Sequence, residues 1–248
     1  MLVMGILNVT PDSFADGGKH NDFESAVARG LQMIAEGVDI IDIGGESTRP
    51  GADRVSEAEE IARTIPVIKE LAKHGVKISI DTMRASTAEA AINAGASIIN
   101  DVSGGLADPL MLQTAARLKV PYISMHWRGQ SKDMNSKAIY GDVVSDVISE
   151  LQERIDAALD AGISRDKLII DPGLGFAKDA DHNWAIIDAI DQFVSMGYPV
   201  LVGASRKRFL GGDSPDEREQ ATIDLTKRLA PTGVWAVRVH SVKPHKEV

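Results

Sequence analysis

A short apolar run with a polar residue near its end, Asp39-Ile40-Ile41-Asp42-Ile43-Gly44, has counterparts along the whole chain. A strand that is buried on both faces of a parallel sheet is expected to be apolar throughout, so a polar residue at its end is a separate signal. In a parallel barrel, the carboxyl ends of the strands are where the active site lies. Eight apolar runs occur, nearly all with a polar residue at or near the end, and they finish at Gly5-Ile6-Leu7-Asn8, Asp39-Ile40-Ile41-Asp42-Ile43-Gly44, Ser79-Ile80-Asp81, Ile98-Ile99-Asn100-Asp101, Ile123-Ser124-Met125-His126, Ile169-Ile170-Asp171, Leu201-Val202-Gly203 and Val237-Arg238-Val239-His240.

One amphipathic helical segment separates each pair of consecutive runs. Ahead of one of them, Ser56 and Glu59 have the spacing of a capping box, which predicts a helix start. The regular alternation of strand and helix predicts an α/β fold, a (β/α)8 TIM barrel in which residues 1–248 form one domain. The eighth strand ends near Val239 and only eight residues follow His240, so we expect the eighth helix to be incomplete or missing.

Composition argues against several classes of function. The net charge of -9 argues against nucleic acid or an anionic membrane surface as a partner. The longest apolar runs have the length of strands, so no membrane-spanning helix is expected, and the N-terminus lacks the basic region of a signal peptide. The chain has no cysteine, which excludes disulfides and thiol catalysis and suits a cytoplasmic location.

Cations gather at one side of the predicted barrel mouth, because strands seven, eight, one and two are neighbours in a closed barrel. Loops beside strands seven and eight often bind phosphate in such barrels. Arg238 and His240 are two residues apart and therefore point the same way. We interpret this side as a phosphate or diphosphate clamp; for Arg206 or Arg208 taken singly, solvated surface charge is an equal alternative. The cations are Arg49, Arg206, Lys207, Arg208, Arg238 and His240.

Carboxylates lie elsewhere on the mouth, where Asp81, Asp101 and Asp171 end or follow three of the strands, with Asn100 beside them. A carboxylate accepts two parallel N–H bonds and an asparagine offers one donor and one acceptor, so the set suits the edge of an amino-pyrimidinone. The alternative is that Asp81 and Asp101 only cap the helices that follow, which is a serious alternative for Asp101.

A transition-metal site is not indicated, because the histidines lack companions at the spacing of metal ligands. The sequence gives little evidence for any metal, and Mg²⁺ is the one compatible with it. Mg²⁺ is commonly held by substrate phosphate oxygens and one or two protein oxygens. The amide of Asn8, at the end of the first strand, is the predicted protein ligand.

Six longer motifs follow one another along the chain. They are Met4-Gly5-Ile6-Leu7-Asn8-Val9-Thr10-Pro11-Asp12-Ser13-Phe14, Gly44-Gly45-Glu46-Ser47-Thr48-Arg49-Pro50-Gly51, Asn100-Asp101-Val102-Ser103-Gly104-Gly105, Asp171-Pro172-Gly173-Leu174-Gly175-Phe176, Ser205-Arg206-Lys207 and Arg238-Val239-His240. Together they resemble the motifs of bacterial dihydropteroate synthases, the pterin-binding family, over essentially the whole chain. Two shorter stretches, His126-Trp127-Arg128 and Phe176-Ala177-Lys178, look closest to actinobacterial members.

The resemblance implies condensation of p-aminobenzoate with 7,8-dihydropterin-6-ylmethyl diphosphate, which gives 7,8-dihydropteroate and pyrophosphate in folate synthesis. It implies Mg²⁺ as cofactor and a homodimer as the assembly. The implied catalytic residues are Asp81, Lys207, Arg238 and His240, and the implied metal ligand is Asn8. The implied substrate-binding residues are Phe14, Thr48, Arg49, Pro50, Asp81, Asn100, Asp101, Asp171, Lys207, Arg238 and His240.

By the same resemblance, Asp171, Asn100 and Lys207 hold the pterin and Arg238 and His240 bind the diphosphate. Two alternatives share the pterin-facing residues. A pterin-dependent methyl-transfer barrel needs no diphosphate clamp, so the cations disfavour it. A non-catalytic paralogue that binds pterin without turnover keeps every binding residue, and the sequence leaves it open.

Overall fold

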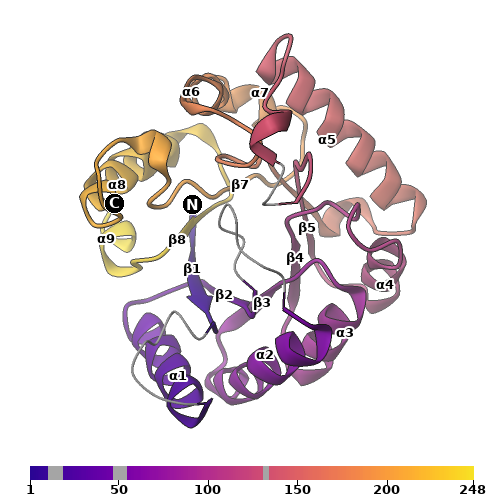
Figure 1. The fold of residues 1–248 in the computed structure, drawn as a ribbon, viewed down its shortest axis with the longest axis vertical. Helices are drawn as coiled ribbons and strands as arrows, with labels where there is room; N and C mark the ends of the chain where they lie inside the picture. Colours follow the sequence, from indigo (N-terminus) through magenta and orange to yellow (C-terminus); the bar gives the residue numbers. More distant parts are fainter. Residues whose placement is uncertain (11–18, 47–54, 131–133) are drawn as a thin grey trace.

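Eight parallel strands form a nearly closed barrel in the computed structural model, which describes residues 1–10, 19–46, 55–130 and 134–248. The hydrogen-bonded strand order is β6-β5-β4-β3-β2-β1-β8-β7. Figure 1 looks down the barrel, with the strands inside a ring of helices. The predicted (β/α)8 barrel is therefore confirmed. The strands are β1 Leu2–Asn8, β2 Ile40–Gly44, β3 Lys77–Asp81, β4 Ile98–Asp101, β5 Tyr122–Met125, β6 Leu168–Asp171, β7 Leu201–Val202 and β8 Ala236–Val239.

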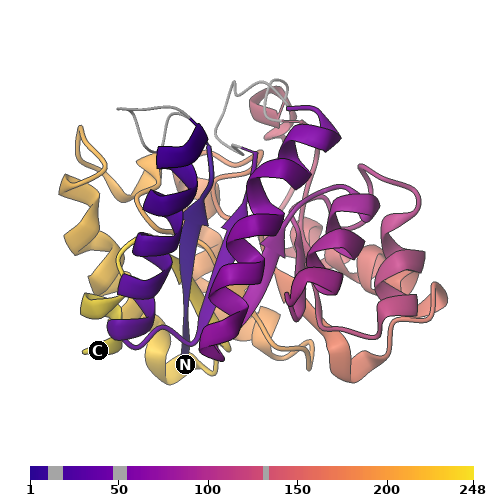
Figure 2. The same ribbon diagram turned by 90° about the horizontal axis from the view of Figure 1, so that it is seen from below.

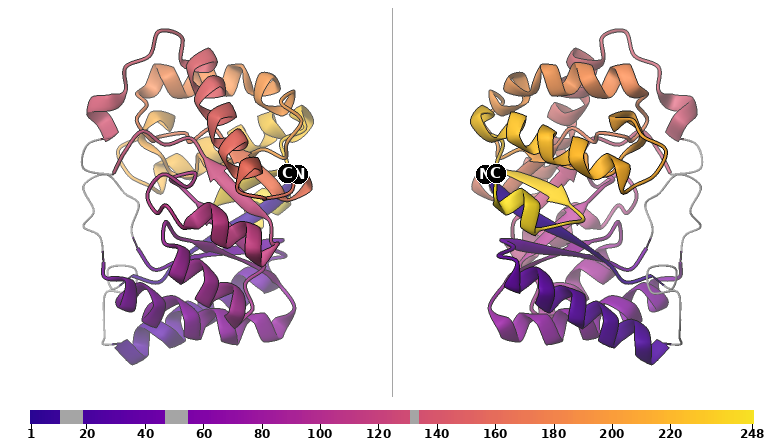
Figure 3. Two further views of the ribbon diagram at one scale, coloured as in Figure 1. Left: turned by 90° about the vertical axis from the view of Figure 1, so that its right-hand side faces the viewer. Right: turned by 90° about the vertical axis from the view of Figure 1, so that its left-hand side faces the viewer.

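Helices cover the outside of the strands on both sides of the molecule (Figure 3). Side-chain caps begin some of them: Ser56 Oγ accepts from the N–H of Glu59, and Asp142 Oδ1 accepts from the N–H of Ser145. The Glu59 carboxylate bonds to Arg63, so the predicted capping box forms only in its Ser56 half. The helices are α1 Lys19–Ala35, α2 Glu57–Leu71, α3 Ala85–Ala94, α4 Met111–Leu118, α5 Val143–Asp160, α6 Ala180–Asp188, α7 Ile190–Val194, α8 Glu217–Leu229 and α9 Lys243–Lys246.

Closure of the barrel is weakest between β6 and β7. The backbone pairing at this junction is an isolated parallel bridge between Ile170 and Val200, the residue before β7, and β7 itself has two residues. After β8 the chain forms α9, a helix of four residues that packs on α8. The segment after β8 is therefore helical over these four residues. None of the described helices is long and apolar enough to cross a membrane.

Alternation along the strands produces two apolar layers. One faces the helices and contains the larger core cluster, with residues such as Ile41, Ile80 and Val237. The other fills the barrel interior and consists of Met4, Ile40, Ile98, Ile123, Ile169, Leu201 and Ala236. Since successive side chains point to opposite faces, the residue two positions after each interior residue also faces the interior. These next positions form the floor of the barrel mouth.

The carboxyl ends of the strands all lie at one end of the barrel, because the strands are parallel. In Figure 2, β1 rises from the N-terminus at the bottom, so this end is at the top of the view. Connections of the βα type leave the strands there, and active sites of such barrels are built on that end.

Candidate active site at the carboxyl ends of the strands

A layer of polar side chains lies directly above the apolar filling of the barrel. Asp42, Asn100, Asp171 and Arg238 each come two residues after an interior apolar residue of their own strand, so they share its inward face. Asp81 is paired in register with Asn100 on the next strand and joins the same layer. The structure thus brings together four of the sequence-predicted site residues and adds Asp42.

Arg238 is held between two buried carboxylates. Its Nε donates to Asp42 Oδ2 at 2.6 Å, and its Nη2 donates to Asp81 Oδ2 at 2.7 Å. Asn100 Nδ2 donates to the same Asp42 oxygen at 3.0 Å. Asp42 is fully buried and Arg238 keeps 19% of its side chain exposed. The guanidinium is therefore fixed in direction while one side remains open to a ligand at the mouth.

Charge crowding perturbs this cluster. Burial raises the pKa of Asp81 to about 7; the Arg238 charge opposes this rise, and the neighbouring Asp42 carboxylate adds to it. A carboxyl group with a raised pKa near neutrality stabilises a developing positive charge less at low pH, when it is protonated. A ligand charge that enters the barrel mouth can therefore change the protonation of Asp81.

Asp42 was not among the sequence-predicted site residues. It lies one residue before Ile43 in the interior of its run, whereas the prediction drew on the polar residues that end the runs. The sequence does indicate Asp42, because it follows the interior residue Ile40 by two positions and therefore lies on the same inward face of the strand. A buried aspartate on that face must meet a cation or a hydrogen-bond donor, and Arg238 and Asn100 supply both.

Asp171 and Lys207 form a second part of the site. Asp171 Oδ1 accepts the Gly173 N–H at 2.7 Å, and no hydrogen bond to Oδ2 occurs within the described residues. Lys207 Nζ donates to the carbonyl of Leu174 and lies 4.6 Å from the centre of the Phe176 ring. Burial lowers the pKa of Lys207 to about 8 against the opposing charge of Asp171. The carboxylate of Asp171 and the ammonium of Lys207 thus lie close enough to interact electrostatically.

His240 follows β8 and is tied to the loop after β7. Ser205 Oγ accepts the His240 backbone N–H at 3.2 Å and lies 2.9 Å from the ring Nδ1. Arg29 of α1 donates to the His240 carbonyl at 2.9 Å. The strand end carrying the imidazole is therefore fixed on both sides, two residues beyond Arg238 as the sequence predicted.

Asp101 stabilises its own turn and does not cap the helix that follows, since α4 begins at Met111 and its N-cap residue is Leu110. Its Oδ1 accepts from the N–H and the hydroxyl of Ser103, and its Oδ2 accepts from the Gly105 N–H and the Tyr122 hydroxyl. A carboxylate has about four acceptor positions, so its capacity is used by its own turn and by β5. Asp101 also has the parity of Ile99, which faces the helices. The structure does not join Asp101 to the inward layer.

We expect Asp101→Asn to destabilise the fold by about 1–3 kcal/mol, because an amide NH2 would face groups that donate. The affinity for a pterin should stay unchanged. Urea unfolding and calorimetric titration of the folded variant measure the two quantities. A pterin affinity that falls together with the stability would place Asp101 in the site after all.

Of the remaining predicted cations, Arg206 is structural. It donates from Nε to Glu219 of α8 at 2.7 Å and from Nη2 to Ser241 at 3.0 Å. Arg208 is exposed and makes no hydrogen bond or ion pair within the described residues. The surface alternative therefore describes Arg208, and neither arginine belongs to the inward layer.

The last predicted residues concern the metal and the second substrate. Asn8 ends β1, paired with Gly44, and its side-chain amide has no hydrogen-bond partner within the described residues. The part of the chain that the structure describes contains no cluster of three or more His, Cys, Asp or Glu arranged to hold a metal. Phe14, Thr48, Arg49 and Pro50 lie outside the described residues.

Known proteins match this chain over nearly its full length. A family model described as pterin binding enzyme matches residues 4–240. The dihydropteroate synthase of Mycobacterium leprae is 49% identical, with 97% of this chain and 88% of the relative covered, and that of Bacillus subtilis is 47% identical, with 98% and 84% covered.

Solved structures that resemble this chain are also dihydropteroate synthases. A Xanthomonas albilineans dihydropteroate synthase with 4-aminobenzoic acid superposes with a TM-score of 0.93 at 43% identity, covering 99% of this chain and 89% of that one. The same organism's enzyme in complex with 7,8-dihydropteroate gives a TM-score of 0.90 at 40% identity, covering 99% and 90%.

Proposed function

This chain belongs to the pterin-binding enzyme family and is an enzyme of dihydropteroate synthesis, and from that premise we propose how its residues divide the work. The reaction joins p-aminobenzoate to 7,8-dihydropterin-6-ylmethyl diphosphate. The observation that supports this assignment most strongly is the layer of inward-facing polar side chains. In that layer Arg238, bonded to Asp42 and Asp81, lies at the same level of the barrel as Asp171.

The pterin is proposed to bind between Asp171, Asn100 and Lys207. The Asp171 oxygen that makes no hydrogen bond in the described part of the chain accepts from the amino-pyrimidinone edge, and the Lys207 ammonium donates to a ring acceptor. Asp101, whose carboxylate is saturated by its turn, is left out of this proposed set.

The diphosphate is proposed to bind at Arg238 and His240, with Arg49 as a further contact. The bond from the methylene carbon to the diphosphate oxygen breaks, and its electron pair leaves with the diphosphate. The aniline nitrogen then forms the new bond to carbon and loses a proton to solvent. Arg238 neutralises the leaving group, and ionised Asp81 stabilises the cationic pterin methylene.

Magnesium is proposed to bind with the diphosphate at Asn8. The residues present fit the ion, because the Asn8 side-chain amide has no hydrogen-bond partner within the described residues and stands at the same end of the barrel as Arg238. A single amide oxygen is the type of protein ligand that Mg²⁺ uses when phosphate and water supply the rest. The ion would neutralise charge on the leaving group.

We expect Asn8→Ala to raise the Mg²⁺ concentration for half-maximal rate by about tenfold, since one protein oxygen is lost. The thermal unfolding midpoint should not change, because the side chain is half-buried at the rim and packs in neither apolar layer. A magnesium titration of initial rates, with calcium as a second ion, makes the measurement. An unchanged magnesium requirement would remove Asn8 from the metal site.

The p-aminobenzoate site is proposed to involve Phe14, Thr48 and Pro50. A homodimer is the proposed assembly and the cytoplasm the proposed location, the latter supported by the absence of cysteine. These proposals rest on the family resemblance of the motifs that contain the residues.

A pyrophosphate-release assay with both substrates tests the whole proposal. Release that depends on p-aminobenzoate, with dihydropteroate as the product, supports the synthase. Pterin binding by calorimetry without release identifies the non-catalytic paralogue. Methyl-transfer barrels share the pterin-facing residues, and consumption of a methylated pterin without any diphosphate would favour that class instead.

A further inference from the structure

The turn from Pro172 to Ala177 determines where Lys207 lies. Its Leu174 carbonyl accepts the Lys207 ammonium, and its Gly173 N–H binds Asp171. Gly173 has φ +70, and a Cβ there would lie 2.4 Å from the His126 carbonyl oxygen, so only glycine fits. Ala177 has φ +48, an uncommon conformation for a residue with a side chain. Such a turn needs contacts that hold it in place.

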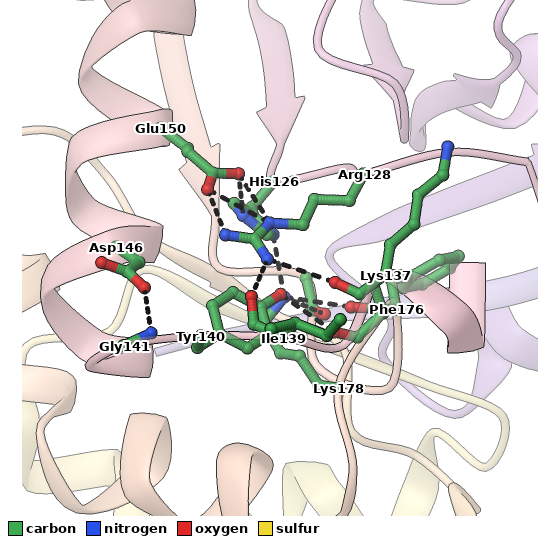
Figure 4. A network of polar contacts seen from close by, with 12 residues as sticks. His126, Arg128, Lys137, Ile139, Tyr140, Gly141, Asp146, Glu150, Phe176 and Lys178 are labelled. Carbon is green, nitrogen blue, oxygen red and sulfur yellow. Dashed lines mark hydrogen bonds and ion pairs between the residues drawn. The ribbon is translucent and has the colours of Figure 1, made fainter. Parts of the chain in front are cut away.

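Lys178 supplies those contacts from beneath the turn. Its ammonium lies 3.1 Å from the carbonyl oxygens of Gly173 and Phe176 and 2.8 Å from His126 Nδ1. The other imidazole nitrogen, Nε2, lies 2.9 Å from Glu150 Oε2. Figure 4 shows the resulting chain from the α5 carboxylate through the imidazole to the lysine. Both Lys178 and His126 are buried.

The chemistry of the partners fixes where the protons are. An ionised carboxylate only accepts, so His126 carries its proton on Nε2 and offers a lone pair on Nδ1. All three neighbours of the Lys178 nitrogen are then acceptors, and only a charged ammonium has three hydrogens to give them. A neutral amine would lose one of the three bonds that hold the turn.

The pKa values of Lys178, Glu150 and His126 are all shifted in this network. Burial is the main cause that lowers the pKa of Lys178 to about 7; the charge of Asp171 opposes it, those of Lys207 and Arg128 add to it, and that of Glu150 opposes it. The hydrogen bond from His126 is the largest effect that lowers the pKa of Glu150 to about 2, so this carboxylate is always ionised near neutrality. Burial lowers the pKa of His126 to about 4, so the imidazole stays neutral.

Arg128 fastens the outer end of the chain. Its Nε lies 3.1 Å and 3.0 Å from the two Glu150 oxygens, and its Nη1 donates to the carbonyls of Lys137 and Ile139. The guanidinium carbon lies 3.8 Å from the centre of the Tyr140 ring, and the Tyr140 hydroxyl donates to the Ala177 carbonyl at 2.9 Å. The network therefore returns to the same turn from the other side.

We propose that Glu150, acting through His126, is a positioning residue for the pterin site: it keeps Lys178 in the ammonium form and so holds the turn that places Lys207 and Asp171. This inference rests on the proposed pterin contacts of Lys207 and Asp171. Its first step, the control of the Lys178 charge by Glu150, is independent of them.

Lysine-selective ¹³Cε NMR titration tests the first step, with the Lys178 resonance assigned from Lys178→Arg. In Glu150→Gln the amide oxygen still accepts from His126, but the negative charge is gone. The Lys178 midpoint should fall by about one pH unit. Glu153→Gln is the matched control, because Glu153 is an exposed residue of α5 that makes no hydrogen bond or ion pair within the described residues, and it should leave the midpoint in place.

Arg128→Gln separates electrostatic control from general damage to the network. It removes a cation that lowers the Lys178 pKa, so the midpoint should rise, opposite to Glu150→Gln. Midpoints that move in the same direction in both variants, or that do not move in Glu150→Gln, overturn the proposal.

Kinetics test the second step. In Glu150→Gln, kcat/KM for the pterin diphosphate should match wild type at low pH, where Lys178 is charged in both proteins, and its alkaline limb should shift down by about one unit. The KM for p-aminobenzoate should not change. A loss of equal size at every pH overturns the positioning role. A protein that binds pterin without turnover would show the same alkaline shift in calorimetric pterin affinity, so failure of the activity and failure of this inference remain distinguishable.

Discussion

Arg238→Met should lower kcat/KM for the pterin diphosphate by about 10³-fold, the loss seen when a preorganised electrostatic group is removed from a developing charge. Arg238 is fixed by Asp42 and Asp81 before any ligand arrives, so the cation need not be reoriented during the reaction. Methionine has similar length and no charge. Steady-state kinetics with both substrates measures the effect, and most of it should appear in kcat.

The same change should lower the free energy of unfolding by about 3 kcal/mol, because Asp42 would be left as an uncompensated buried carboxylate. Adding Asp42→Asn to Arg238→Met should restore most of the stability without restoring the rate. Arg208→Met is the matched control, since Arg208 is exposed and has no partner within the described residues. A rate loss in Arg238→Met that the second change repairs would show that the arginine serves the fold alone.

The barrel itself was predictable from the sequence because nearly every strand is a short apolar run with a polar residue at or near its end, and amphipathic helical segments lie between the runs. These are local patterns, and the parallel sheet translates them directly into an inside, an outside and a mouth. The weak β6–β7 junction was not predictable, because its single bridge at Ile170 and Val200 depends on how the two strand ends meet.

Which face of its strand a residue occupies predicts membership of the site better than a position at the polar end of a run. Asn100 and Asp101 are adjacent, yet Asn100 faces the barrel interior with Ile98, and Asp101 faces Tyr122 and the helix layer. Asp42 shares the inward parity of Ile40. Counting every second residue from the interior residues Ile40 and Ile98 selects Asp42 and Asn100 as inward-facing and leaves Asp101 out. The sequence alone already allows this distinction.

The network below the pterin turn could not be predicted in the same way. His126, Glu150 and Lys178 come from a strand end, a helix and a loop, and no sequence spacing relates them. Glu150 in particular resembles any solvated charge of an amphipathic helix. Its role follows only from packing, which brings its carboxylate to a buried imidazole.

Asp171→Asn should weaken pterin affinity by about 10- to 100-fold, as expected when a buried acceptor is replaced by a donor that faces donors. The substitution is close to a single-atom change. The asparagine oxygen can still accept the Gly173 N–H that Asp171 Oδ1 accepts at 2.7 Å, so the turn survives. The altered atom is Oδ2, which makes no hydrogen bond within the described residues and is the oxygen assigned to the ligand.

The dependence of this affinity on pH gives a second measure of the same residue. Burial raises the pKa of Asp171, against the N–H of Gly173 and the charges of Lys207 and Arg238. A carboxylate with a raised pKa is lost by protonation as the pH falls through that value, so wild-type pterin affinity should decline on the acid side. The asparagine variant has no such proton to bind and should lack that decline.

Calorimetry with a pterin across the acid range makes the comparison. Asp101→Asn is the control, because it makes the same chemical change in a carboxylate saturated by its own turn. An acid-side decline that persists in Asp171→Asn would assign the titration to another group, with Asp81 the first to examine, and an unchanged affinity would remove Asp171 from the pterin site.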